Sequence, residues 1–105
     1  MIPVMCIVQQ NQISDGIIEA LQADINHFTL RAFNEQAQIN WISIPEGDGF
    51  TAAEPSKTII ISLHANEALT TDKRVTLLNQ LCDLAQHHTG LSANEIVTSV
   101  RDPQE

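Results

Sequence analysis

Few side chains in this sequence could take part in acid-base chemistry or bind an anion, and two of them follow expected strands. His64 comes directly after the expected strand 58–63, and an imidazole at a strand end could exchange a proton with a ligand. Arg101 comes just past the last expected strand, 96–100, where its guanidinium could reach a pocket at a subunit contact. Each also has a plainer interpretation: His64 as a structural histidine with its hydrogen bonds satisfied, and Arg101 as a solvated charge at a strand end. Both remain candidates for substrate binding.

The other basic side chains and histidines have local explanations. Arg31, near the end of the first expected helix, complements the helix dipole. Lys73 and Arg74 lie in the opening turns of the second helix, where the dipole disfavours cations; an anion site is one interpretation and a solvated face the other. His87 and His88 close that helix, where positive charge is favourable, and adjacent histidines lack metal-ligand spacing. We therefore predict no metal site and no cofactor.

The composition limits the possible partners. Thirteen acidic side chains against five basic ones give the 105 residues a formal charge of −8. Nucleic-acid binding needs clustered Lys and Arg to neutralise phosphates, and negative charge also repels anionic membranes. No apolar run approaches the roughly 20 residues of a membrane span, and the first residues carry no signal-peptide features. We predict a cytoplasmic protein that binds neither nucleic acid nor membrane, with Cys6 and Cys82 as reduced, buried thiols.

The hydrophobic pattern predicts two successive β-α-β units in one domain, residues 1–105. Apolar residues spaced by three and four follow the cap residues Ser14 and Asp15, which predicts a helix to about Phe33. A second helix is capped at 70–72 and ended by Gly90. The remaining expected elements are strands 3–8, 38–44, 58–63 and 96–100, which gives β-α-β units at 2–45 and 57–101, separated by an irregular loop at 45–56.

These elements predict an α/β fold of the α+β two-layer sandwich type. Each crossover helix makes its two strands parallel, and two helices cover one face of a four-stranded mixed sheet. The strands carry apolar residues on both faces, so the other face needs a second subunit to cover it, and we predict a homo-oligomer. Trp41 could line a pocket or a subunit contact, and the contact is favoured. Ferredoxin-like domains share this order of elements.

A proline heads the first expected strand in the segment Pro3–Val8, and two further segments of interest are Thr58–Thr71 and His88–Val97. Together these three segments resemble the tautomerase superfamily, which includes 4-oxalocrotonate tautomerase, macrophage migration inhibitory factor and the cis-3-chloroacrylic acid dehalogenases. The resemblance implies a tandem β-α-β monomer assembled as a trimer, with pockets at the subunit contacts. It also implies carboxylate binding through arginines and an amino-terminal proline as general base, which Pro3 matches. Residues 64–69 lack the arginines of the dehalogenase-like members, which argues against dehalogenation.

The encoded sequence places Met1 and Ile2 before Pro3, so the prolyl nitrogen is a tertiary amide and not a base. Two functions therefore stay open for this scaffold. If Met1 and Ile2 are removed, the protein is a keto-enol isomerase of a small keto acid with Pro3 as general base. If they stay, it is a catalytically inactive oligomer that binds a ligand or another protein. A ferredoxin-like regulatory ligand-binding domain is a third hypothesis.

Overall fold

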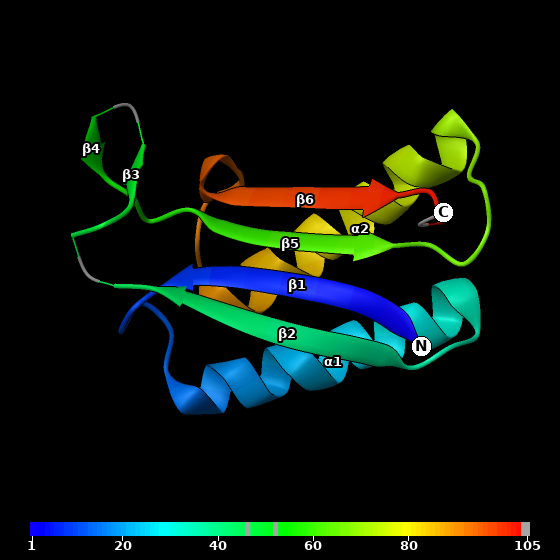
Figure 1. The fold of residues 1–105 in the computed structure, drawn as a ribbon, viewed down its shortest axis with the longest axis horizontal. Helices are drawn as coiled ribbons and strands as arrows, with labels where there is room; N and C mark the ends of the chain where they lie inside the picture. The colour runs from blue at the N-terminus through cyan, green and yellow to red at the C-terminus, as the bar shows by residue number, and fades with distance from the viewer. Residues whose placement is uncertain (46, 52, 104–105) are drawn as a thin grey trace.

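A four-stranded sheet with both long helices on one face makes up the body of the computed structural model, which describes residues 1–45, 47–51 and 53–103 (Figure 1). The strand order is β2-β1-β5-β6. The sheet strands are β1 (Ile2–Gln9), β2 (Ala37–Ile44), β5 (Ile59–His64) and β6 (Ile96–Arg101). The helices are α1 (Asp15–Phe33), α2 (Thr71–Thr89) and the short 3₁₀ helix η1 (Ala93–Glu95). Among the described residues, no helix is long and apolar enough to cross a membrane.

The strand directions distinguish this fold from the ferredoxin-like alternative. β1 pairs parallel with β2, β5 pairs parallel with β6, and β1 pairs antiparallel with β5. The two strands of each β-α-β unit are therefore neighbours, whereas ferredoxin-like domains have split units whose two strands are separated by another strand. The predicted two-layer sandwich with a mixed sheet is confirmed, and the ferredoxin-like hypothesis is wrong.

Local cap chemistry fixes both long helices. The Ser14 hydroxyl accepts from the Ile17 amide at 3.3 Å, and Thr70 plays the same role for the amide of Lys73 at 3.2 Å. α1 ends at Asn34 and α2 at Gly90, both with left-handed backbone (φ 58° and 73°). The second helix thus ends at the predicted glycine.

β1 alternates between the core and the open face of the sheet. Its residues Ile2, Val4, Cys6 and Val8 are buried beneath the helices, and burial raises the pKa of the Cys6 thiol to about 12. Cys6 is a free thiol, as predicted, and so is the partly buried Cys82. The sequence of β1 is apolar at nearly every position because the residues on its open face are apolar too. That face exposes Met5 of β1 at 44%, together with Ile42 (43%) and Val97 (47%) of the two edge strands.

The structure differs from one expectation and adds a contact that the sequence did not predict. The loop 45–56 contains a short antiparallel hairpin, β3 (Phe50–Thr51) with β4 (Glu54–Pro55), where we expected no regular structure. Trp41 does not face the open side of the sheet: it packs against the core, and its indole N–H donates to Gln22 Oε1 of α1 at 2.8 Å. Its partner in register is the buried Cys6, which places both side chains on the helix face.

Asn66, just after β5, ties the second β-α-β unit to the end of α1. Its side-chain amide donates to the Phe33 carbonyl at 2.8 Å and to Glu35 Oε2 at 2.6 Å. The pKa of Glu35 is lowered, first by this bond and then by the Met1 ammonium group 2.9 Å away. A lowered carboxyl pKa stabilises the fold above the pKa of the unfolded chain, and that contribution is lost as the pH falls through the folded-state pKa.

We predict that Asn66→Ala raises the pKa of Glu35 towards its ordinary value of 4.5, because the largest cause of the shift is removed. Titration of the Glu35 side-chain carboxyl carbon by NMR measures the change. Asn79→Ala, on the exposed surface of α2, is the matched control and leaves that titration in place. An unchanged Glu35 titration in Asn66→Ala would contradict the hydrogen bond.

Candidate functional site

An open pocket of about 460 Å³ lies on the uncovered face of the sheet. Residues of all four sheet strands line it: Pro3, Val4, Met5, Ile7, Asn40, Ile60, Ser62, His64 and Arg101. None of these is acidic, although the chain carries a formal charge of −8. Apolar walls with a few polar groups are typical of small-molecule sites.

The sheet register brings the three sequence-predicted candidates, Pro3, His64 and Arg101, to this pocket. Val4 pairs with Leu63 in the antiparallel β1/β5 ladder, and Pro3 and His64 are the next residues along on the same face. His64 pairs with Arg101 in the parallel β5/β6 ladder. The amino end of β1 and the carboxyl ends of β5 and β6 therefore meet at one end of the sheet (Figure 1).

Pro3 lies inside a paired strand. Its neighbour Ile2 is 1% exposed and is one of the largest fully buried side chains. The Ile2 amide donates to the Gln36 carbonyl at 2.8 Å, and Ile2 pairs with Ala37 of β2. The bond between Ile2 and Pro3 thus joins a core residue to a pocket residue. With that bond intact, the prolyl nitrogen has no basic lone pair.

His64 is half-buried, and the segment after β6 fixes its ring. Its Nδ1 lies 3.2 Å from the carbonyl oxygen of Asp102. The Asp102 carboxylate in turn pairs with Arg74 of α2 and accepts from the Leu69 amide at 3.2 Å. Sequence spacing could not reveal this connection, because the groups lie far apart along the chain.

Arg101 extends from the exposed end of β6 over the open face. Its Nε donates to the Ser99 hydroxyl at 3.4 Å, which turns the side chain back along the strand. Two other cations are neutralised nearby: Lys73 pairs with Glu67 at 2.8 Å, and Arg74 pairs with Asp102. Within the ranges that the structure describes, no ion pair occupies Arg101, so its terminal nitrogens can bind an anion.

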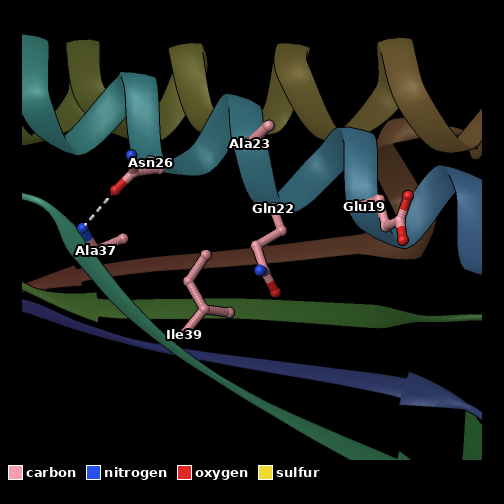
Figure 2. A pocket seen from close by; sticks show the side chains of 6 residues that line it. All are labelled: Glu19, Gln22, Ala23, Asn26, Ala37 and Ile39. Carbon is pink, nitrogen blue, oxygen red and sulfur yellow. Dashed lines mark hydrogen bonds between the residues drawn. The ribbon is translucent and has the colours of Figure 1, made fainter.

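A second pocket, of about 320 Å³, lies between α1 and β2, but its polar groups serve the fold. Figure 2 shows the Asn26 side chain reaching from α1 to the backbone of β2, where its Oδ1 accepts from the Ala37 amide at 2.8 Å. Gln22, another lining residue, is the partner of the Trp41 indole. The described residues of this pocket include no histidine, cysteine or cation. These contacts hold α1 against β2 and leave few polar groups free to bind a ligand.

Of the two histidines at the end of α2, His88 contacts the other helix. His88 Nε2 lies 2.8 Å from Asp24 Oδ2 of α1, an interhelical pair that the sequence analysis missed. His87 stacks edge-on against His88 with ring centroids 5.2 Å apart. In the described part of the chain, no group of three or more His, Cys, Asp or Glu side chains is placed to hold a metal ion.

Solved structures with the same arrangement of strands and helices identify the fold. A member of the cis-3-chloroacrylic acid dehalogenase family, N1, superposes with a TM-score of 0.85 at 12% sequence identity, over 96% of this chain and 74% of its own. A fused 4-OT wild-type symmetric trimer superposes at 0.83 and 11% identity, over 96% and 85% of the two chains. A macrophage migration inhibitory factor-like protein from Entamoeba histolytica superposes at 0.76 and 11% identity, over 98% and 89%. The chain has the tautomerase-superfamily fold.

The tautomerase fold was the one implied by the resemblance of three sequence segments, and that expectation is confirmed. The similarity lies in the structure, since the sequence matches no protein-family model and no curated protein. At 11% to 12% identity it establishes the fold alone. The chemistry of the pocket has to be argued from the residues of this chain.

Because Ile2 is fully buried, we predict that Ile2→Ala lowers the free energy of unfolding by about 2–5 kcal/mol. Chemical denaturation measures the loss. Val75→Ala, at a side chain of α2 that is 49% exposed, is the control and costs about 0.5 kcal/mol or less. A loss for Ile2→Ala as small as that of the control would show that the first residues of β1 contribute little to the core.

Proposed function

We propose that this protein is a non-catalytic ligand-binding oligomer on the tautomerase fold, which binds a small carboxylate in the pocket of Pro3, His64 and Arg101. One observation carries this proposal. The peptide bond that blocks the Pro3 nitrogen is anchored on its other side by Ile2, whose side chain is in the core and whose amide is in the sheet. The general base that the family resemblance implies is thus absent, while the groups for binding remain.

Arg101 is the group that makes a carboxylate the favoured ligand. A guanidinium donates two parallel hydrogen bonds to a carboxylate, the strongest geometry available to it. None of the described residues that line the pocket is acidic, so none of them competes with the ligand. The apolar side chains of Met5, Ile7 and Ile60 can cover a hydrocarbon body attached to the carboxylate.

The oligomer in this proposal is a homotrimer. The open face of the sheet exposes Met5, Ile42 and Val97, and apolar surface of this kind is stabilised when another subunit covers it. The fused 4-OT structure that superposes on this chain is a symmetric trimer, which supports the same assembly here. A pocket on the open face then lies at or beside a contact between subunits.

To test ligand binding, we suggest titrating benzoylformate, a carboxylate with an apolar ring, into the wild type and Arg101→Gln by calorimetry. Loss of a charge-assisted hydrogen bond costs about 1.5–3 kcal/mol, so the variant should bind about 10- to 150-fold more weakly. Arg31→Gln removes an equal charge from the exposed end of α1 and leaves the affinity unchanged. Equal affinities of wild type and Arg101→Gln would contradict the proposed role of Arg101.

Keto-enol isomerisation of a small keto acid is the second candidate function, favoured by the position of Pro3 in the same pocket as Arg101. It requires removal of Met1 and Ile2, which would free the prolyl nitrogen as a secondary amine able to carry a proton. The cost is a fully buried isoleucine and a backbone hydrogen bond of 2.8 Å. That cost is the reason it comes second.

Intact mass and activity together decide between the two functions. We expect the purified protein to retain Met1 and Ile2 and to show no Pro3-dependent tautomerisation of phenylpyruvate. A mass that begins at Pro3, with activity that disappears in Pro3→Ala, would instead establish the isomerase. Arg101→Gln is a useful companion, because an isomerase that uses this pocket loses activity there as well.

A further inference from the structure

We propose that Asp102, held by Arg74, is a positioning residue that fixes the His64 ring so that the pocket selects carboxylates with a hydroxyl group on the neighbouring carbon. The inference rests on the proposed carboxylate binding by Arg101 and adds the ligand class and the residues that set it. It is carried by the chain of contacts His64–Asp102–Arg74 at the edge of the pocket.

The hydrogen bond to Asp102 decides which nitrogen of His64 carries the proton. A carbonyl oxygen can only accept, so Nδ1, 3.2 Å from the Asp102 carbonyl, must be the donor. In the neutral imidazole, the other nitrogen, Nε2, then has no proton and is an acceptor. His64 lines the pocket and Asp102 does not, so the acceptor nitrogen is the one left for a ligand.

The position of the Asp102 carbonyl depends on two contacts to the start of α2 and the turn before it. The Asp102 carboxylate pairs with Arg74 and accepts the Leu69 amide at 3.2 Å. Arg74 also donates to the Leu69 carbonyl at 3.4 Å, so all three residues hold one another. Without the Arg74 guanidinium, the Asp102 carboxylate loses its ion pair and the segment after β6 is less firmly held. His64 Nδ1 then loses a fixed hydrogen-bond acceptor.

Because His64 and Arg101 are neighbours, the tautomer of His64 determines which carboxylates the pocket prefers. The two residues are register partners on adjacent strands, so an acceptor nitrogen lies beside a guanidinium. A 2-hydroxy acid satisfies both, since its carboxylate binds Arg101 and its hydroxyl donates to Nε2. The matching 2-keto acid presents a carbonyl oxygen to Nε2. Both atoms are acceptors, so no hydrogen bond forms between them and both stay unsatisfied.

Mandelate and benzoylformate are the matched probes, because they differ only in a hydroxyl or a keto group next to the carboxylate and neither can enolise through a methylene group. Calorimetry is done at pH 8. We expect one enantiomer of mandelate to bind at least tenfold more tightly than benzoylformate. In Arg74→Gln this ratio falls towards one, while binding of benzoylformate is retained. Arg31→Gln is the control and keeps the wild-type ratio.

The ring nitrogens of His64 give a second readout that a general loss of stability does not imitate. In the wild type, ¹⁵N NMR should show the proton on Nδ1, and in Arg74→Gln the signals should move towards the other tautomer. Asp102→Asn removes the ion pair with little change in shape and should have the same effect, so the test survives if Arg74→Gln fails to fold.

The possible failures are distinguishable. If mandelate and benzoylformate bind the wild type equally well, or if His64 carries its proton on Nε2, the inference is overturned and carboxylate binding stands. If neither acid binds, the proposed function itself fails. If both variants keep the wild-type ratio and tautomer, Asp102 and Arg74 do not position His64.

Discussion

The alternation of β1 between core and open face is the constraint on which the rest of the site depends. Side chains in a strand alternate sides with a period of two, so burial of Ile2, Val4 and Cys6 forces Pro3 and Met5 onto the other face. A shift of one residue would place the proline in the core and expose isoleucine and valine. The same register that brings Pro3 to the pocket therefore encloses the residue before it in the core, so freeing the prolyl nitrogen would remove a buried side chain.

Among the described residues, Arg101 is a cation at the pocket that no carboxylate neutralises. In a protein with a formal charge of −8, a surface arginine is easily neutralised by a neighbouring carboxylate, as Arg74 is by Asp102. Arg101 instead bonds to a neutral hydroxyl and faces a pocket whose described lining residues include no acidic side chain. The field of the whole protein opposes anion binding, so an anion would be held by close contacts rather than by long-range attraction. In the proposed site, Arg101 and the groups beside it would therefore determine which anions bind.

The sequence predicted what depends on local chemistry, and it missed what depends on distant partners. Ser14, Thr70 and Gly90 begin and end helices through groups within a few residues of them, so the helices were predictable. His64 and Arg101 were candidates because each follows an expected strand, and Pro3 was a candidate because the resemblance to the tautomerase superfamily implies a proline as general base. The packing of Trp41 against α1 was not predicted, because its partner Gln22 is a tertiary contact. The role of Asp102 was missed for the same reason: its partners His64 and Arg74 lie 38 and 28 residues away in the sequence.

The pairing of β5 with β6 explains why His64 and Arg101 are direct neighbours in this site. In a split β-α-β arrangement the two strands of each unit are separated by another strand, so β1 would lie between β5 and β6. His64 and Arg101 would then be about 10 Å apart across β1. The parallel pairing observed here makes them register partners, and the antiparallel β1/β5 pair brings Pro3 level with both. The order of elements is the same in both folds, so the arrangement of the pocket depends on strand pairing rather than on that order.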